Sequence, residues 1–386
     1  MSDIDFKRKV IRMIANTDDE AITDPSNGAD HALAKCGGNG DHSNCPEFEV
    51  PYDKVVVAVG CYSQTFGVQG VKEHAFFLRD VGDARAIRQR VLKSFERAAL
   101  PTTDEAERAK LLHFAVVGGG PTGIEFAAEM HDLIHEDLSK LYPCLMKHVA
   151  ITIYDIAPKV LPMFDQNLAN YATDLFRRQG IKVKTEHHLE RIRRDGEHLL
   201  LKIKEEKEEV GAGVVVWSTG LMQNPLVKKL LDKENVEGVG KLVRDPKTGG
   251  IVTDSHMRVK TTGSSNNDGE YLPDVYAVGD CAVVEGQSYP ATAQVASQEA
   301  IYLAKRLNNK DVNTGSAFKF RNLGTMAYLG SWRAIHQSKA DEIKGRAAWI
   351  LWRTAYLTKS MSIRNKILIP IYWAITWLFG RDISRF

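Results

Sequence analysis

The chain has 386 residues, of which 44% are hydrophobic and 26% charged, with 30 glycines and 13 prolines. These are ordinary values for a globular protein, and the length predicts about two or three domains. The formal net charge of +2 gives no reason to expect a nucleic-acid-binding protein, so no nucleic acid is expected as a partner.

Targeting segments and spanning helices are not expected from the sequence. Residues 1–20 mix acidic with basic side chains, unlike a secretory signal or an acid-poor transit peptide. No stretch reaches the roughly 18 unbroken apolar residues that a spanning helix needs. The cysteines form no CxxC pair. Cys36 and Cys45 bracket a turn-rich loop and could bridge or bind a metal, but separate thiols in a reducing compartment are the favoured interpretation, so we expect no metal site.

The predicted elements alternate between strands and helices, which indicates an α/β fold with a parallel sheet. Residues 1–50 are turn-rich and predict exposed loops or disorder. Residues 51–60 (PYDKVVVAVG) carry an almost continuous β-branched run, typical of a buried parallel strand. A charged helix is expected at 80–99, then a linker at 101–110. Further strands are expected at 113–117, 150–155, 181–186, 199–207, 214–217 and 274–280, with helices from 124 to Pro143, between 155 and 181, and at 292–307.

Three glycines supply the clearest chemical motif. Gly118, Gly120 and Gly123 spell GxGxxG between the strand at 113–117 and the next helix. The first glycine permits a tight turn, the second lets a pyrophosphate approach the backbone, and the third lets helix and strand pack closely. The helix N-terminus adds free N–H groups and a positive dipole. The strand before and the helix after favour a dinucleotide site over a purely structural glycine turn.

An acid at the end of the next strand would select the nucleotide. Asp155 ends the strand at 150–155, where a carboxylate hydrogen-bonds the ribose hydroxyls of NAD and repels a 2′-phosphate. Its separation from Gly123 exceeds the usual ~20 residues, because the intervening helix is long. Lys159 lies nearby and could weaken discrimination against NADPH. Because Asp155 disfavours a 2′-phosphate, NADH is the expected nucleotide.

The C-terminal tail changes character. Residues 367–379 are apolar at nearly every position, but the segment is too short to span a bilayer and contains a proline. The residues before it alternate aromatic with basic side chains, which is typical of helices lying in one leaflet. Residues 347–386 are therefore expected to dock on a membrane surface. The alternative is a packed core helix or a dimer contact, and an interfacial surface can also be shared by a homodimer.

The segments VVGGGPTGIEFAAEMHDLIHEDLSKLYP, VYAVGDCA, ATAQVASQEA and WLFGRDISRF resemble the type II NADH:quinone oxidoreductases. The similarity runs from about Tyr52 to Phe386. It implies an α/β fold of two dinucleotide-binding, glutathione-reductase-like domains with C-terminal membrane-docking helices. It also implies that NADH reduces FAD and that FAD reduces ubiquinone, without proton pumping. The implied location is peripheral on the mitochondrial inner membrane, and a homodimer is expected through the family alone.

The resemblance assigns cofactor and quinone roles to residues of the second half. Asp280 matches the acid that binds the ribityl or phosphate part of the flavin, the alternative being an ordinary strand-end turn. Ala293, Gln294 and Gln298 match the segment that lies against the isoalloxazine and forms the quinone pocket. Without the family, both glutamines would be surface residues. Gly220 fits a close approach of the backbone to the cofactor.

Glu125 is the remaining candidate. It lies two residues after the GxGxxG motif, where it would face the junction of nicotinamide and flavin. An acid near a helix N-terminus that merely interacts with the helix dipole is an equally good interpretation. Because the cofactor supplies the redox chemistry, no nucleophile is expected.

The sequence departs from the family at its N-terminal side. Nothing before Gly118 fits a first GxGxxG for the FAD pyrophosphate, so we expect an incomplete FAD domain and an N-terminally truncated chain that binds FAD poorly, which puts its activity in doubt. The expected domains are a remnant of the FAD domain at 1–110, an NADH domain at 111–220, the rest of the FAD domain at 221–320 and the docking segment at 321–386.

Two alternatives remain open. One is a non-catalytic NADH-binding remnant, which the missing motif favours. The other is a soluble pyridine-nucleotide flavoprotein reductase, against which the aromatic, basic tail argues. Residues 266–270 are too short for an EF-hand, so calcium regulation through such a loop is not expected.

Overall fold

The computed structural model describes residues 3–14, 47–233, 240–263, 270–312, 314–339, 341–360, 362–381 and 383. The chain divides into two compact units. Unit 1 comprises residues 1–64 and 220–322, and unit 2 comprises residues 65–219 and 323–386. The cysteines at 36 and 45, the glycine-rich loop between them and most of the segment at 266–270 lie outside the described residues.

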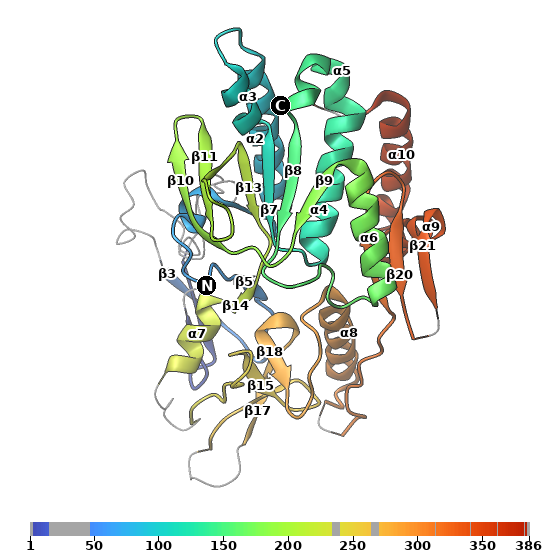
Figure 1. Ribbon diagram of the computed structural model, residues 1–386. Helices are drawn as coiled ribbons and strands as arrows, with labels where there is room; N and C mark the ends of the chain where they lie inside the picture. Colours follow the sequence, from blue (N-terminus) through green and yellow to red (C-terminus); the bar gives the residue numbers. More distant parts are fainter. Residues whose placement is uncertain are drawn as a thin grey trace. The chain divides into compact units, whose positions relative to one another are not determined.

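Unit 2 is built on a five-stranded parallel sheet (Figure 1). Its strands, in spatial order, are β6 (Phe76–Phe77), β13 (Val214–Trp217), β7 (His113–Val117), β8 (Ala150–Tyr154) and β9 (Ile181–Lys184). All residues of the central strand β7 are buried. Burial on both faces is the property expected of a parallel sheet covered on each side, so the α/β prediction is confirmed.

Alternate residues of β7 pack into two different layers. Phe114 and Val116 belong to the cluster formed with helices on one face. These helices are α2 (Val81–Ala99), α4 (Pro121–Asp132) and α6 (Gln166–Gln179). Ala115 and Val117 belong to the cluster on the other face. That face is covered by α1 (Val71–His74) and by the antiparallel strands β10 (Leu189–Asp195), β11 (His198–Ile203) and β12 (Val210–Ala212).

The long helix after the glycine motif changes geometry halfway. Helix α4 passes into a π-helical turn, η4 (Leu133–Leu138), and then into α5 (Ser139–Leu141). The helix ends before Pro143, as predicted, and that proline begins a 3₁₀ helix, η5 (Pro143–His148). π-Helical turns are rare and occur often at functional sites, so η4 is a candidate functional segment of this helix.

The prediction of a linker at residues 101–110 is wrong. Residues 105–111 form helix α3 (Glu105–Leu111), and the carboxylate of Asp104 caps it by accepting a hydrogen bond from the Glu107 N–H at 2.7 Å. An acid at the N-cap satisfies one of the free N–H groups of the first turn. The polar composition that suggested a linker is therefore that of a short, capped surface helix.

The C-terminal part of unit 2 is an antiparallel sheet followed by two helices. Its elements are β19 (Thr325–Tyr328), β20 (Ala334–Gln337), β21 (Glu342–Gly345), α9 (Arg346–Lys359) and α10 (Ile363–Phe379). Helix α10 contains Pro370 and has no buried residue. No helix in the described part of the chain is long and apolar enough to cross a membrane.

Unit 1 holds a mixed five-stranded sheet. Its strands in spatial order are β18 (Ala282–Val284), β15 (Ile251–Thr253), β16 (Arg258–Lys260), β17 (Tyr271–Ala277) and β4 (Val55–Val57). The smaller elements are β1 (Asp3–Asp5), β2 (Val10–Ile14), β3 (Glu47–Pro51), β5 (Cys61–Ser63), β14 (Leu221–Gln223), α7 (Pro225–Asp232), η6 (Gly279–Cys281) and α8 (Ala293–Asn309).

Strand β4 is shorter and less buried than its sequence suggests. It pairs in parallel with β17, as expected for this run of valines. However, Val56 is 42% exposed, while its neighbours Val55 and Val57 are buried. One face of this short edge strand is therefore open, and the prediction of a strand buried on both faces is corrected.

The units also differ from the expected domain boundaries. The sequence predicts that residues 65–110 belong to the first domain, but they belong to unit 2 because β6 pairs with β13 and α2 packs on the central sheet. Residues 323–386 belong to unit 2 as well. The C-terminal segment and the GxGxxG helix are therefore parts of one compact body.

Candidate functional site

The three glycines of the motif have different surroundings. Gly118 directly follows β7 and begins the turn with a φ of +115°, and a Cβ there would lie 2.5 Å from the Ser218 carbonyl oxygen. A Cβ on Gly123 would lie 2.0 Å from the carbonyl oxygen of Gly118. Gly120 is the N-cap of α4 without a side-chain cap, and a Cβ there would meet nothing within 4 Å. Two glycines are thus required by packing, and the third leaves open space at a helix N-terminus, which fits a pyrophosphate.

Asp155 lies beside this cradle. It directly follows β8, and its Oδ2 accepts a hydrogen bond from the backbone N–H of Gly119. Its Oδ1 accepts from the Ala157 N–H at 2.7 Å. These bonds fix the carboxylate at the carboxyl end of the strand next to β7, where each oxygen keeps a further lone pair for a ribose hydroxyl.

Glu125 is turned toward the C-terminal part of unit 2. Its Oε1 accepts hydrogen bonds from the backbone N–H of Tyr328 at 2.8 Å and from the Trp352 indole at 3.2 Å. Burial raises the pKa of Glu125, against the opposing effect of these two bonds. The carboxylate therefore ties the start of α4 to β19 and α9. Its expected place at the nicotinamide remains a prediction.

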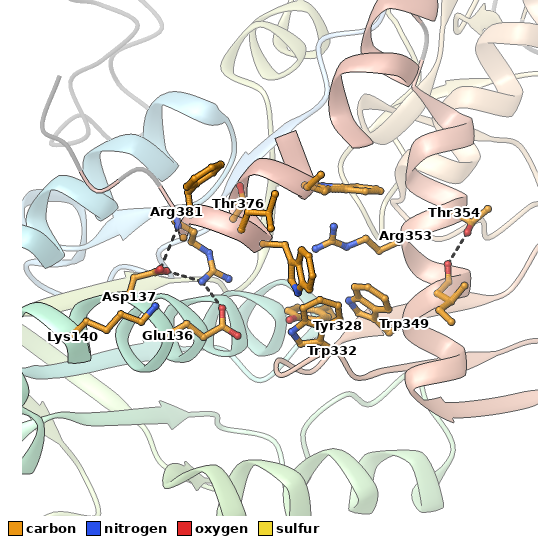
Figure 2. A pocket seen from close by; sticks show the side chains of 17 residues that line it. Glu136, Asp137, Lys140, Tyr328, Trp332, Trp349, Arg353, Thr354, Thr376 and Arg381 are labelled. Carbon is orange, nitrogen blue, oxygen red and sulfur yellow. Dashed lines mark hydrogen bonds and ion pairs between the residues drawn. The ribbon is translucent and has the colours of Figure 1, made fainter. Parts of the chain in front are cut away.

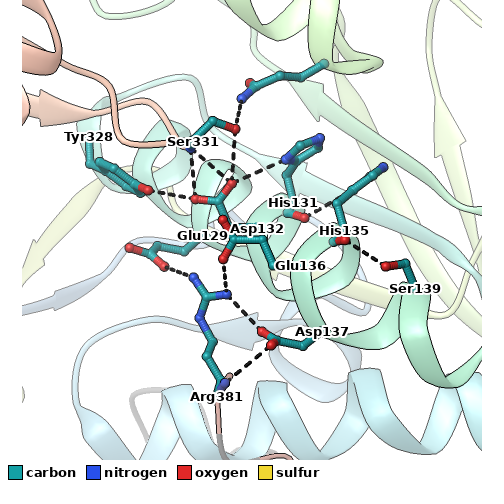
Figure 3. A network of polar contacts seen from close by, with 11 residues as sticks. Glu129, His131, Asp132, His135, Glu136, Asp137, Ser139, Tyr328, Ser331 and Arg381 are labelled. Atoms are coloured by element: carbon teal, nitrogen blue, oxygen red, sulfur yellow. Dashed lines mark hydrogen bonds and ion pairs between the residues drawn. The ribbon is translucent and has the colours of Figure 1, made fainter. Parts of the chain in front are cut away.

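A buried polar network lies further along the same helix (Figure 3). Asp132 is 2% exposed. It accepts hydrogen bonds from the Tyr328 hydroxyl at 2.7 Å and from the Ser331 backbone N–H at 3.0 Å, and His131 lies within 3.5 Å of its other oxygen. The sequence analysis missed this network. Its only local signal was an acid on the apolar side of a long helix.

The π-helical turn contacts Arg381, which follows α10 (Figure 3). Arg381 contacts Glu136 at 2.8 Å and Asp137 at 2.9 Å through one guanidinium nitrogen. Its backbone N–H also donates to Asp137. The closing segment that resembled the family thus contacts the acidic end of the GxGxxG helix directly.

In unit 1, the turn after β17 carries the candidate flavin residue Asp280. The preceding Gly279 has a φ of +74°, and its N–H donates to the carboxylate of Glu299 at 2.7 Å. The Cys61 thiol donates to Asp280 at 3.4 Å. Burial, followed by the negative charge of Asp280, raises the pKa of Cys61 to about 11, so this thiol stays protonated and unreactive at neutral pH.

Helix α8 presents the other candidates of unit 1. Ala293 and Gln294 lie in its first turn, which Thr292 caps. Gln298 binds the backbone of Arg321 through both ends of its amide, at 2.9 and 3.0 Å. That double contact holds the side chain in one orientation. Gln298 is thus a fixed part of the helix, which the sequence alone did not indicate.

Glu299 is a residue that the sequence analysis missed. It is 5% exposed, and it lies four residues after the buried Val295 on the same face of α8. Burial raises the pKa of Glu299, and the nearby charge of Asp280 adds to this effect. A glutamate at a helix position spaced with apolar residues was the available signal. Its bond to Gly279 orients the turn that carries Asp280.

The last candidate residue is Gly220. It has a φ of +61°, and its carbonyl oxygen accepts a hydrogen bond from the Gln64 N–H at 3.3 Å. Contact of Gly220 and Asp280 with the ribityl and phosphate part of a flavin remains a prediction. In the described residues of unit 1, however, β4 leads into β5 and not into a helix, so that part shows no second glycine-rich helix N-terminus for a pyrophosphate.

Family models match nearly the whole chain. Residues 25–300 match the pyridine nucleotide-disulphide oxidoreductase model, and residues 322–382 match the NDH2 C-terminal domain model.

Several proteins of known name are similar over most of the chain. A probable NADH dehydrogenase of Dictyostelium discoideum is 41% identical, covering 89% of this chain and 71% of its own length. An internal alternative NAD(P)H-ubiquinone oxidoreductase of Solanum tuberosum mitochondria is 34% identical, covering 88% and 67%. A probable mitochondrial NADH-ubiquinone oxidoreductase of Schizosaccharomyces pombe is 33% identical, and the match spans 65% of that relative.

The fold is also shared with a solved structure. The structure of NDH2 from Plasmodium falciparum in complex with NADH superposes with a TM-score of 0.81 at 23% identity, over 99% of this chain and 84% of that one. This similarity supports the same fold for the chain.

Proposed function

The chain belongs to the type II NADH dehydrogenase family of pyridine nucleotide-disulphide oxidoreductases, and on that basis we propose that it oxidises NADH and reduces ubiquinone through FAD at a membrane surface, without pumping protons. Its relatives are named as NADH or NAD(P)H-ubiquinone oxidoreductases. The proposal extends their named activity to this chain.

One observation carries the proposal: the open space at Gly120 lies at the uncapped N-terminus of α4, and Asp155 contacts the adjacent Gly119. A dinucleotide needs these two features together, free N–H groups for its pyrophosphate and an acceptor for its ribose hydroxyls. In the proposed complex, Gly118 and Gly123 hold the loop close to the helix, and Asp155 disfavours a 2′-phosphate.

The residues proposed for the flavin are those of unit 1. FAD, when bound, supplies the chemistry that takes a hydride from NADH and gives electrons to a quinone. Asp280 and Gly220 would contact the ribityl and phosphate part, and Ala293 would lie against the ring. Gln294 and Gln298 would present polar groups to the quinone, and the backbone of Arg321 supports this role for Gln298 by fixing its amide.

The proposed membrane surface is formed by the C-terminal helices. Helix α10 buries none of its side chains, and large apolar residues on it are exposed, with Trp377 at 69% and Phe379 at 83%. A large exposed apolar surface in a water-soluble part of a protein usually marks an interaction site. We therefore assign peripheral docking to residues 347–386. Relatives named as mitochondrial support a mitochondrial location, and the inner membrane and a homodimer are parts of the same proposal.

A second candidate function is NADH binding without flavin chemistry. It is favoured by one observation, that the described part of unit 1 shows no second glycine-rich helix N-terminus. The two functions differ in whether flavin is bound.

The deciding experiment is the visible spectrum of the full chain, purified in detergent, before and after NADH. Flavin that bleaches with NADH and recovers with ubiquinone would support the oxidoreductase. A colourless protein that still binds NADH would support the second candidate. Asp280→Ala serves as the matched variant, since it should lower bound flavin and leave NADH binding in unit 2 unchanged.

A further inference from the structure

A cavity of about 700 Å³ that is open on one side lies within unit 2, lined mainly by residues of η4, β19, α9 and α10 (Figure 2). Four of the six tryptophans of the chain line it: Trp332, Trp349, Trp373 and Trp377. Its volume is in the range of pockets that bind one small molecule. None of the residues proposed to contact NADH, FAD or quinone lines it, so it is a separate site.

The cavity contains a cation, Arg353, that forms no direct ion pair in the described part of the chain, although the charge of Glu129 acts on it from a distance. The guanidinium of Arg353 lies 4.1 Å from the centre of the Trp373 ring and 4.9 Å from that of Trp349, and it points into the middle of the lining residues (Figure 2). Among the described residues, no carboxylate forms an ion pair with Arg353, and its buried Nε has no hydrogen-bond partner. A half-buried charge and a buried, unpaired N–H both favour binding of an anion.

The neighbouring cation behaves differently. Arg381, at the opposite side of the lining residues (Figure 2), is neutralised by Glu136 and Asp137. Glu136 and Asp137 therefore form ion pairs with Arg381 and not with Arg353. Lys140 adds a further positive charge to the lining. Among the described residues, the cavity thus offers one guanidinium that lies among aromatic rings and has no carboxylate in direct contact, with Glu129 acting on it only from a distance.

The chemistry of the occupant follows from this combination. A neutral ring such as a quinone would leave the guanidinium unpaired, and a free inorganic anion would leave the tryptophan walls uncovered. An amphiphile with an anionic headgroup satisfies both. Residues 346–386 contain seven Lys and Arg against a single Asp. This positive charge attracts anionic lipids to the membrane surface on which the segment is proposed to dock, so such lipids would be concentrated near the cavity.

We propose that this cavity binds one anionic phospholipid, with its phosphate on Arg353 and an acyl chain between the Trp373 and Trp377 side chains. This inference rests on the proposed docking of α10 on a membrane. The bound lipid would fill the space behind α10 and tie this helix, which buries no side chain of its own, to α9 and η4.

The test uses the full chain in detergent and measures quenching of tryptophan fluorescence by brominated phosphatidylglycerol and by brominated phosphatidylcholine. We expect saturable quenching by the anionic lipid at about one lipid per chain, and at least roughly tenfold weaker quenching by the zwitterionic lipid. Equal quenching by the two lipids would overturn the proposal. Because this comparison uses the unaltered chain, it does not depend on whether a variant folds.

Two variants locate the site. Arg353→Met keeps most of the side-chain volume and removes the charge, whereas Arg364→Met removes the same charge from an exposed position of α10 outside the cavity. Arg353→Met should weaken binding of the anionic lipid by about tenfold or more, and Arg364→Met should have little effect. An equal loss of lipid binding in both variants would mean that general attraction to a positive surface explains the binding, and it would overturn the proposal. Displacement of the lipid by ubiquinone or by excess inorganic phosphate would also overturn it.

The failure of this inference is distinguishable from failure of the proposed function. Flavin absorbance and its bleaching by NADH do not depend on the cavity. Sedimentation of the full chain with phosphatidylglycerol vesicles measures the docking of α10 on a membrane, independently of the cavity. A chain that binds vesicles but retains no lipid in detergent would refute only the lipid site.

Discussion

The Glu125 carboxylate accepts a hydrogen bond from the indole of Trp352 at 3.2 Å, across 227 positions of the chain. Glu125 is the fifth residue of the helix that begins at the GxGxxG motif, and Trp352 lies on α9 of the C-terminal segment. The proposed NADH site and the proposed membrane-docking segment are therefore joined in one body. A change at either residue is expected to affect the other region.

Replacing Glu125 should reveal the cost of its buried charge. Burial raises the pKa of this carboxyl above its usual 4.5, so its contribution to stability is present below that pH and is lost as the pH rises through the raised pKa. Glu125→Gln keeps an oxygen acceptor without the charge. It should be more stable than the unaltered chain at about pH 8, and the difference should shrink toward pH 4.5.

Urea unfolding followed by tryptophan fluorescence measures this difference. Glu125→Ala is the control, because it leaves the Tyr328 N–H without its acceptor and should lower the free energy of unfolding by about 1–3 kcal/mol. A Gln variant less stable than the unaltered chain at every pH would contradict the prediction.

Asp132 should have the opposite pH dependence. Burial acts to raise its pKa, but the hydrogen bonds from His131, Tyr328 and Ser331 outweigh burial and hold the pKa below the usual 3.8. Its contribution is therefore present above that pH and is lost as the pH falls through the lowered pKa. Asp132→Ala should lower the free energy of unfolding by about 3 kcal/mol at neutral pH, because it leaves buried donors unpaired.

Asp132→Asn tests the charge by itself. It should be less stable than the unaltered chain at neutral pH, and the gap should close below about pH 3.8. The matched control is Asp174→Asn, whose side chain is 53% exposed and should change stability little. A stability gap for Asp132→Asn that is constant with pH would show that the charge of Asp132 contributes nothing.

The glycines of the motif should separate binding from folding. Gly120→Ala places a methyl group in open space, so unit 2 should fold, with a loss of about 1 kcal/mol for the N-cap. The methyl group would occupy the proposed pyrophosphate position and raise the Kd for NADH by about tenfold or more. Gly123→Ala should instead destabilise the fold, because its Cβ would lie 2.0 Å from a backbone oxygen. NADH titration and circular dichroism melting measure the two effects, and normal NADH affinity in the Gly120 variant would refute the site.

Asp155 should control the choice of nucleotide. Asp155→Asn removes the negative charge. It also replaces one carboxylate oxygen by an N–H₂ group, which would face a backbone N–H that now donates to Asp155. We expect roughly tenfold weaker NADH binding and a higher ratio of NADPH to NADH affinity, because repulsion of the 2′-phosphate is lost. The measurement is the titration of each nucleotide by fluorescence. An unchanged ratio would mean that Asp155 does not face the ribose.

Membrane docking should depend on the exposed face of α10. Ile371 and Ile375 are 48% and 45% exposed, so the double change to glutamate should leave folding intact. It should weaken sedimentation with phosphatidylglycerol vesicles by roughly tenfold or more, since charge enters the proposed apolar contact. Val81→Glu, at a position 69% exposed at the start of α2, is the control and should bind vesicles normally. Unchanged sedimentation of the double variant would exclude this face.

Local patterns in the sequence determined much of the second unit. The strands at 113–117 and 214–217 have the predicted bounds, and the helix at 80–99 begins one residue after the predicted start. These elements were predictable because β-branched runs and helical spacing act over a few residues. The glycine motif was equally predictable, since its function depends on its own backbone and on the strand and helix beside it.

Only the tertiary structure decided the partners of the buried polar residues. Asp132 and Tyr328 are 196 positions apart, and Asp137 and Arg381 are 244 apart, and no local pattern relates them. The same holds for Gln298 and the Arg321 backbone and for the membership of residues 323–386 in unit 2. Which distant segments meet depends on how whole apolar faces pack together. The sequence therefore determined the elements and the nucleotide motif, and packing determined which side chains complete the site.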